Sequence, residues 1–199
     1  MGHLLEDTRR GFEAETFYRL AADGGNVEAQ FTLGKFCSYW LDKEEAEKYY
    51  RMAADNGHIR AQVEMGMILY GQKKLDECEK YRRMAADNGD VGSQYDLGCM
   101  FKDEGRLDEA EKYWRMAADG GDVCAQYKLG CLLKDAGRLD ETEKYWRLAA
   151  EAGDAYAQCM LGCLFYEKGH LDEAMKYFRM AAEAGHEGAR EALKNLFGE

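Results

Sequence analysis

The chain has 199 residues, and its 38 acidic side chains outnumber the 27 basic ones to give a formal charge of −11. This surplus of carboxylates repels phosphate backbones and anionic lipid heads, so neither nucleic acid nor a membrane surface is expected as a partner. Proline is absent, and no apolar run approaches the roughly eighteen residues that a membrane span needs. The composition favours a folded, soluble chain.

Seven cysteines are an odd number, and residues 1–10 show neither a basic start nor an apolar signal core. We therefore expect a cytoplasmic location. Met1-Gly2 falls in the register of Leu97-Gly98, so the chain begins midway through a helix. Either the gene starts there or a longer protein was trimmed.

An internal period of 32 residues organises the whole sequence. When the segment 122–153 is shifted along the sequence by multiples of 32 residues, its Ala-Gln dipeptide aligns with the same or a similar dipeptide in each copy. These dipeptides are Ala29-Gln30, Ala61-Gln62, Ser93-Gln94, Ala125-Gln126 and Ala157-Gln158. Glycines recur at fixed offsets in the same copies. A fixed period of this length is typical of stacked supersecondary units. We predict an all-α solenoid of antiparallel helix hairpins that forms a single domain over residues 1–199.

In chain order, the array starts with a truncated leading repeat at 1–25. Five full repeats follow, at 26–57, 58–89, 90–121, 122–153 and 154–185. Residues 186–199 form a C-terminal capping helix with no partner helix after it. Terminal units cover the exposed ends of a solenoid core, and the charged residues of this last helix suit that position.

The first helix of each repeat is predicted from its apolar spacing. In 122–153, Ala125 and Leu129 belong to a stripe at three- and four-residue steps. Asp122 is the expected N-cap, and Gly137 ends the helix in the left-handed conformation. A glycine also recurs inside this helix, as at Gly130, and we expect it to allow close approach of alanines on the second helix.

The second helix is predicted to open with a capping box formed by Asp140 and Glu143, repeated at Asp76/Glu79 and Asp108/Glu111. Glu143 and Arg147 are one turn apart and should pair on a solvated face. At the position of Trp146, the 58–89 repeat holds Arg82, whose stem should pack while its head reaches water or a carboxylate. A local binding feature is the alternative for Arg82.

The recurring pattern AQ…LG…G…A…YW…AA…G resembles the Sel1-like repeat family of the tetratricopeptide superfamily. The LG pair of the first helix and the alanine-rich end of the second are signatures of that family, and the resemblance covers essentially the whole chain. It implies a right-handed superhelix with the first helices on its concave surface. It also implies a non-catalytic scaffold or adaptor for a peptide or protein partner, with effector or inhibitor roles among those known.

The expected concave surface is rich in tyrosine and cysteine, with lysines along one edge. Tyrosine offers a large rigid face and a polar tip, which suit recognition. We therefore expect partner binding at Phe31, Tyr70, Tyr95, Cys99, Lys102, Tyr127, Cys131, Lys134, Tyr156 and Tyr166. Packing between neighbouring repeats is the alternative for some of these aromatics. Self-association is a further option, because an empty apolar groove is an exposed patch.

A thiol-based metal-binding or redox-sensing protein is the second hypothesis, with Cys99, Cys124, Cys131, Cys159 and Cys163 as its residues. Adjacent helices lie about 8–10 Å apart, whereas a disulfide needs Cα atoms within about 7 Å, so a disulfide ladder is not expected. Cys159 and Cys163 are one turn apart, but no nearby motif completes a zinc set. Small apolar packing roles are favoured, and no metal or cofactor is predicted.

The sequence shows no catalytic constellation. His58 and His186 occupy the helix-start position that other repeats fill with Asp or Asn, and His170 occupies a turn position. Serine occurs only at Ser38 and Ser93, and no glycine-rich phosphate loop is present. Without a nucleophile and base that the pattern brings together, the chain is not expected to be an enzyme.

Overall fold

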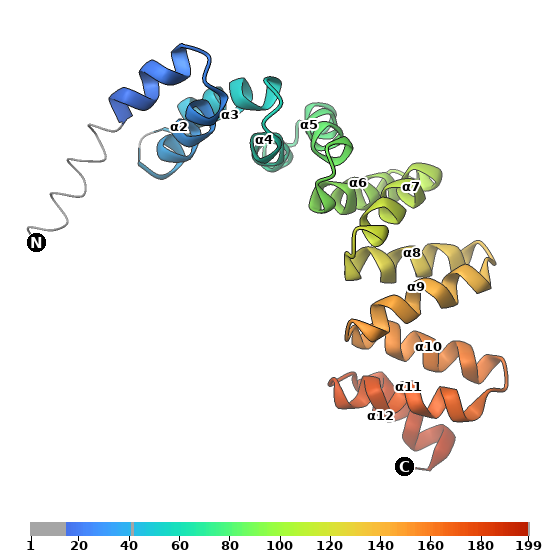
Figure 1. Cartoon of the computed structure of the whole chain (residues 1–199). Coiled ribbons are helices and arrows are strands. Elements are labelled where there is room, and N and C mark those ends of the chain that lie inside the picture. Colours follow the sequence, from blue (N-terminus) through green and yellow to red (C-terminus); the bar gives the residue numbers. More distant parts are fainter. Residues whose placement is uncertain (1–14, 41, 199) are drawn as a thin grey trace, which may run out of the picture. The chain divides into compact units, whose positions relative to one another are not determined.

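The computed structural model describes residues 15–40 and 42–198, and these ranges contain helices and short turns but no β-strand (Figure 1). The predicted leading repeat falls largely on residues 1–14, outside the described ranges, while residues 15–23 are helical. The chain divides into two compact units, Met1–Ser93 and Gln94–Glu199. The prediction of a single domain therefore stays a prediction.

The first unit continues with four helices that pack as two hairpins. They are α2 (Val27–Trp40), α3 (Lys43–Asp55), α4 (Ile59–Gly71) and α5 (Leu75–Asp87). Helix α2 packs on α3, α4 packs on α5, and α3 contacts α4 between them. Leu33, Met65, Leu69 and Tyr81 are almost wholly buried in its core.

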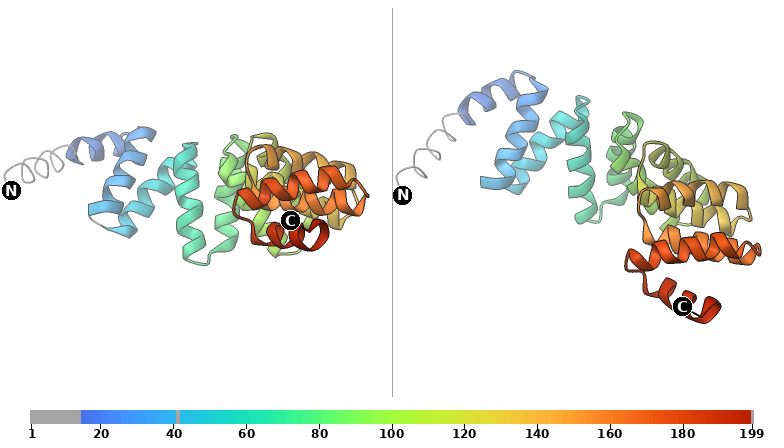
Figure 2. Two further views of the ribbon diagram at one scale, coloured as in Figure 1. Left: turned by 90° about the horizontal axis from the view of Figure 1, so that it is seen from below. Right: turned by 60° about the horizontal axis from the view of Figure 1, so that its bottom comes forward.

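The second unit contains most of α6 (Val91–Asp103) and the helices that follow it. These are α7 (Leu107–Asp119), α8 (Val123–Asp135), α9 (Leu139–Glu151), α10 (Ala155–Glu167), α11 (Leu171–Glu183), α12 (Glu187–Ala192) and the short π-helix η1 (Leu193–Phe197). The pairs α8–α9 and α10–α11 are hairpins that two further views show from other sides (Figure 2). The all-α class and the packing of consecutive helices as hairpins are thereby confirmed.

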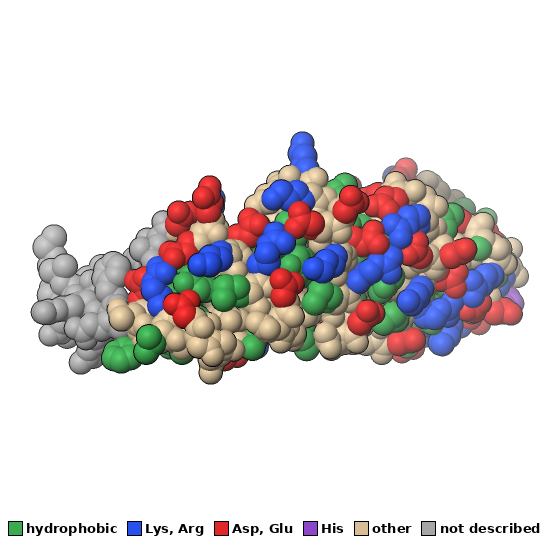
Figure 3. Space-filling view, turned by 90° about the horizontal axis from the view of Figure 1, so that it is seen from above, with side chains coloured by type: hydrophobic (Ala, Val, Ile, Leu, Met, Phe, Trp, Pro, Cys, Tyr) green, Lys and Arg blue, Asp and Glu red, His purple; other side chains and the backbone are tan. Residues whose placement is uncertain are grey.

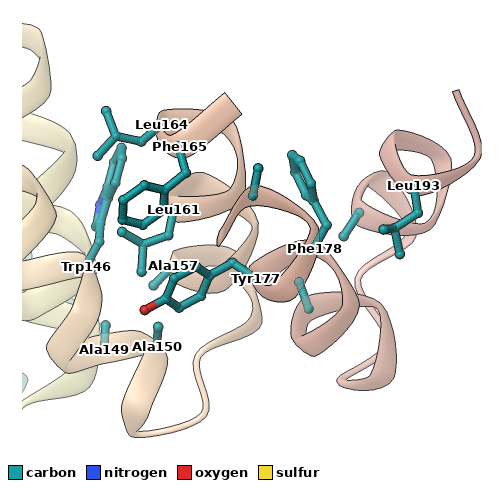
Figure 4. Close-up of a cluster of buried hydrophobic side chains, with 13 residues drawn as sticks. Trp146, Ala149, Ala150, Ala157, Leu161, Leu164, Phe165, Tyr177, Phe178 and Leu193 are labelled. Atoms are coloured by element: carbon teal, nitrogen blue, oxygen red, sulfur yellow. The ribbon is translucent and has the colours of Figure 1, made fainter. Parts of the chain in front are cut away.

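A cluster of buried side chains joins consecutive hairpins of the second unit. Trp146 of α9, Leu161 and Phe165 of α10 and Phe178 of α11 pack in it together with small alanines (Figure 4). Each hairpin buries one face against its neighbour, so burial of apolar surface holds the array together. No helix within the described ranges is long and apolar enough to cross a membrane.

Local hydrogen bonds explain where the first helices begin and end. The Asp122 carboxylate accepts from the Ala125 N–H at 2.6 Å, as an N-cap should. His58 takes the same position in its repeat, and its Nδ1 accepts from the Ala61 N–H at 3.2 Å. Gly137 follows α8 with a φ of 75°, a conformation that glycine adopts without a Cβ clash. These cap predictions are confirmed.

The predicted capping box is wrong. Helix α9 starts at Leu139, and its N-cap is Arg138, whose side chain makes no capping bond. The reason lies in the preceding turn, where the Arg138 N–H donates to the Leu133 carbonyl at 2.9 Å. The Arg138 carbonyl then accepts the first hydrogen bond of the helix, from the Thr142 N–H at 3.0 Å. Asp140 therefore lies within the first turn, where its charge favours the helix dipole.

The partner predicted for the glycine inside each first helix is also wrong. In α2, α6, α8 and α10 an aromatic ring of the second helix lies against this glycine, where alanines were expected. A Cβ atom added to Gly162 would lie 2.6 Å from the Phe178 ring, and one added to Gly34 would lie 2.7 Å from the Tyr50 ring. In these four helices the glycine is needed because a large flat ring fills the space between it and the second helix.

Arginines of the second helices join consecutive repeats. Arg115 donates to Glu111 at 2.6 Å, which confirms the predicted pairing one turn apart. It also donates to Glu141 at 3.2 Å and to the Tyr145 hydroxyl at 3.1 Å, both on the next second helix. Basic and acidic side chains accordingly lie side by side over one face of the molecule (Figure 3). The sequence analysis missed the links between repeats.

Candidate functional site

A groove of about 500 Å³ lies within the second unit. Helix α6 lines it with Tyr95, Cys99, Lys102 and Asp103, and α8 lines it with Tyr127, Lys128, Cys131, Leu132 and Asp135. Trp114 of α7 also borders the groove, although this side chain is almost wholly buried. The two first helices of consecutive repeats thus form the walls, and the indole of the intervening second helix lies beneath them.

The helical repeat places these side chains on one face. Tyr95 and Cys99 are four residues apart on α6, as Tyr127 and Cys131 are on α8, so each pair projects from the same side of its helix. The two pairs are related by the 32-residue period, and the packed hairpins hold them at equivalent positions. The groove is therefore built from helices, which position side chains more rigidly than loops do.

Burial keeps the groove's tyrosines and Cys131 neutral. It raises the pKa of Tyr127 to about 12, with a further contribution from Cys131. Burial and a hydrogen bond with Cys99 likewise raise the pKa of Tyr95. The pKa of the Cys131 thiol is raised by burial as well. Both hydroxyls are therefore protonated at neutral pH, and each can donate and accept a hydrogen bond.

Charge is confined to the lysines and aspartates among the lining residues. Lys102 and Lys128 carry positive charge, and Asp103 and Asp135 carry negative charge. Lys102 and Asp103 are exposed at the C-terminal end of α6. The site therefore combines aromatic and sulfur-bearing walls with both signs of charge, an arrangement that suits a mixed polar and apolar ligand.

The structure brings together half of the predicted binding residues. Tyr95, Cys99, Lys102, Tyr127 and Cys131 line one groove. The sequence analysis missed Trp114 and the charged residues Asp103, Lys128 and Asp135 among the residues that line the groove. A signal for Asp135 was available, because it lies four residues after Cys131 on the same helical face.

Three other predicted residues of the second unit lie outside this groove. Lys134 points its Nζ to within 5.8 Å of the Trp146 ring centre. Tyr156 is 61% exposed, and its ring centre lies 6.1 Å from that of Tyr127. Tyr166 meets Phe197 edge to face at 6.3 Å. Lys134 therefore lies beside α9, Tyr156 beside Tyr127 of α8, and Tyr166 beside η1.

The two predicted residues of the first unit differ sharply in exposure. Phe31 is only 6% exposed and stacks on the His58 ring with centres 4.2 Å apart, so it packs between helices. Tyr70 is exposed, and its ring centre lies 5.7 Å from the guanidinium carbon of Arg82.

All seven cysteines are free thiols. Over the ranges that the structure describes, no three or more His, Cys, Asp or Glu side chains are grouped so that they could hold a metal ion. Cys37 and Cys78 are buried, whereas Cys124 is exposed.

The packed hairpins define a helical repeat protein, and in the second unit a groove lies between its first helices. Comparison with models of known families shows which kind of helical repeat this is. The Sel1 repeat matches residues 27–58, 59–90, 91–122 and 125–154, and a tetratricopeptide repeat matches residues 155–184. The Sel1 matches cover more than half of the sequence, and the chain belongs to the Sel1 repeat family. Such repeats commonly mediate protein–protein interaction and are typically non-catalytic.

Solved structures share this fold. The chain is similar to c5321, described as a protective antigen of uropathogenic Escherichia coli strains, with 23% identity and a TM-score of 0.74 over 93% of this chain and 45% of that one. It also resembles a Sel1 repeat protein from Oxalobacter formigenes, with 24% identity and a TM-score of 0.65 over 100% of this chain and 89% of that one.

A third similar structure is YrrB, described as a tetratricopeptide protein with an unusual peptide-binding site. It shows 20% identity and a TM-score of 0.63 over 89% of this chain and 97% of that one. The chain spans less than half of c5321. No match was found among curated proteins. At these identities the structural likeness defines the fold alone.

Proposed function

We propose that the chain is a non-catalytic interaction scaffold that binds a peptide segment of a partner protein in the groove between α6 and α8. The observation that carries this proposal is that three aromatic side chains, Tyr95, Tyr127 and Trp114, line one groove. Aromatic side chains supply large contact areas at low entropic cost and dominate the energetics of many interfaces. The peptide-binding description of YrrB supports the same class of ligand.

In this proposal, an apolar side chain of the peptide enters between the two tyrosines. Their protonated hydroxyls hydrogen-bond the peptide backbone, which offers both donors and acceptors. Lys102 and Asp103 then contact charged groups of either sign beside the apolar anchor. Because the groove is built on packed helices, little ordering is needed on binding.

The lining residues also favour binding over catalysis. No histidine lines the groove, and the raised pKa of Cys131, which burial causes, keeps its thiol a poor nucleophile at neutral pH. No nucleophile–base pair is formed by these residues, so a scaffold explains the site better than a hydrolase does. Two lysines and two aspartates line the groove, so these side chains form no basic stripe for nucleic acid.

The test is selection of peptides from a displayed random library on the immobilised full chain. Selected peptides are then titrated calorimetrically into the wild type, into Tyr95→Ala/Tyr127→Ala, and into Tyr70→Ala as a control outside the groove. Removing two anchors should weaken binding by at least about 2 kcal/mol, while the control binds as the wild type does. Circular dichroism checks that each variant is folded.

Two results would overturn this proposal. Selected peptides that bind the folded double variant as tightly as the wild type would place recognition elsewhere. A concentration-dependent dimer that the double variant abolishes would show that a second copy of the chain occupies the groove. Sedimentation of both proteins distinguishes this case.

A further inference from the structure

Helix α10 differs from α6 and α8 at one position of the helical face that in α6 and α8 lines the groove. All three helices share a cysteine. Four residues before it, the successive repeats hold Tyr95, Tyr127 and Cys159. The cysteine itself recurs as Cys99, Cys131 and Cys163. Only α10, among these three helices, therefore carries two thiols one turn apart. The two earlier helices provide matched internal comparisons with one thiol each at these positions.

The helix holds Cys159 and Cys163 close together. Residues four apart on an α-helix have Cβ atoms about 5–6 Å apart on one face. Both side chains are partly exposed and pack against the buried cluster that includes Trp146 and Phe178. The thiols thus lie at the border between an apolar core and solvent, where a small ion can reach them but bulk water is limited.

Two opposite charges lie beside the pair. The Nζ atom of Lys134 on α8 lies 3.8 Å from a carboxylate oxygen of Glu167, which follows Cys163 by one turn on α10. Lys134 therefore favours a negative charge on the sulfur atoms, and Glu167 opposes it.

The ligand set limits which ion fits. Over the described ranges, no third Cys, His, Asp or Glu joins the pair in a metal-holding group, so the four ligands of a structural zinc site are not at hand there. Thiolates select soft ions, and Cu(I) is a soft ion that two sulfur ligands can hold. We propose that Cys159 and Cys163 form a two-thiolate site for Cu(I).

The proposed binding step is balanced without a redox partner. Two S–Cu bonds form, the two thiols release two protons to solvent, and copper stays Cu(I). The product carries one net negative charge, and the ammonium of Lys134, which pairs with Glu167, offsets part of it. The surrounding aromatic cluster limits access of water and oxidant, a role that apolar surroundings commonly have at metal sites.

The experiment uses the full chain, reduced and free of oxygen, with Cu(I) supplied as its bicinchoninate complex. The wild type should withdraw one Cu(I) per chain, and X-ray absorption should show two sulfur ligands. Replacing even an outer hydrogen-bond partner of a metal ligand weakens binding about 10–100-fold, so removing a ligand should weaken it at least about 100-fold. Cys159→Tyr, which restores the residue of the preceding repeats, and Cys163→Ser should both show this loss.

Cys131→Ser is the control, because it removes the equivalent thiol of α8 and should leave Cu(I) affinity unchanged. Cys159→Ser serves in place of Cys159→Tyr if the larger side chain disturbs the fold. Equal Cu(I) affinity in either folded Cys159 variant, or three sulfur ligands in the wild type, would overturn the proposal. The Cys159 variants should still bind the peptides selected on the α6–α8 groove, so the two proposals can fail separately.

Discussion

The hairpins α4–α5 and α8–α9 fill the space over the glycine of their first helix with different side chains. In α8–α9, the fully buried Trp146 ring lies against Gly130. In α4–α5, the stem of Arg82 takes that place, and its Cγ lies 3.0 Å from where a Cβ on Gly66 would be. The prediction that the Arg82 stem packs is confirmed. The comparison shows that this position needs volume over the glycine, and that an aromatic ring is one way to supply it.

The two hairpins differ in their turns as well. Gly137 has a φ of 75°, whereas Lys73, its counterpart 64 residues earlier, adopts a φ of 60°. A side chain other than glycine is strained in this left-handed region by about 1–2 kcal/mol. The α4–α5 hairpin therefore departs from the repeat at two places, and both departures should lower its local stability.

The largest effect is expected from removal of the ring itself. Trp146→Ala should destabilise the protein by about 3–5 kcal/mol, because it leaves a large cavity in a packed core. It also removes the indole N–H that donates to the Tyr127 carbonyl at 3.2 Å. Urea unfolding followed by circular dichroism measures the change. A loss below 1 kcal/mol would show that the neighbouring helices collapse into the space.

Replacing the glycine under Trp146 or under Arg82 with alanine tests how much room each of these side chains leaves. Gly130→Ala should cost about 1–3 kcal/mol, because its Cβ would overlap the rigid Trp146 ring. In Gly66→Ala the flexible Arg82 stem can move, and a gain of about 1 kcal/mol in helix propensity offsets the crowding. Paired thermal melts of the two variants test this, and equal losses would contradict it.

Replacing Arg82 with the tryptophan of other repeats should reduce the difference in stability between the α4–α5 and α8–α9 hairpins. Arg82→Trp reproduces the Gly98/Trp114 arrangement over Gly66 and replaces a largely buried charged group, 8% exposed, with an apolar ring. We expect a gain of about 1 kcal/mol and a higher melting temperature. Calorimetry detects the shift. A lower melting temperature would indicate that the Arg82 guanidinium makes a specific interaction that the indole cannot replace.

The smallest change in stability is expected from the turn between α4 and α5. Lys73→Gly should stabilise the α4–α5 hairpin by about 0.5–1 kcal/mol, since relief of left-handed strain outweighs the entropy that glycine adds to the unfolded chain. Hydrogen exchange of the α4 and α5 amides should slow accordingly. Gly137→Ala serves as the reverse variant, and faster exchange in Lys73→Gly would contradict the expectation.

Most of the fold could be predicted because its signals are local. Asp122 and Gly137 act within their own turn, so their roles follow from residue type and spacing. The start of α9 could not be predicted in this way, because Asp140 and Arg138 compete as N-cap and the hydrogen bonds of the preceding turn decide between them. Similarly, the ring opposite Gly130 depends on how two helices approach each other.

The candidate site was only partly predictable for a related reason. Phe31, Tyr95 and Tyr127 occupy one position of the repeat, yet Phe31 is buried while the tyrosines are partly exposed. Phenylalanine has no polar tip to keep in solvent, and His58 offers it a ring to stack on. The period places these residues on one face, but neighbouring side chains decide which of them remain available to a ligand.

The arginine links between repeats have a consequence for the length of the array. Arg115 contacts residues 26 and 30 positions further along the chain, Glu141 and Tyr145. If the block 122–153 were deleted in frame, Glu173 and Tyr177 would follow Arg115 at the same two offsets. The hydrogen bond to tyrosine recurs at the next junction, where Arg147 donates to Tyr177 at 2.9 Å. Recombination can therefore lengthen or shorten the gene by whole blocks while each new junction keeps the residues for this contact.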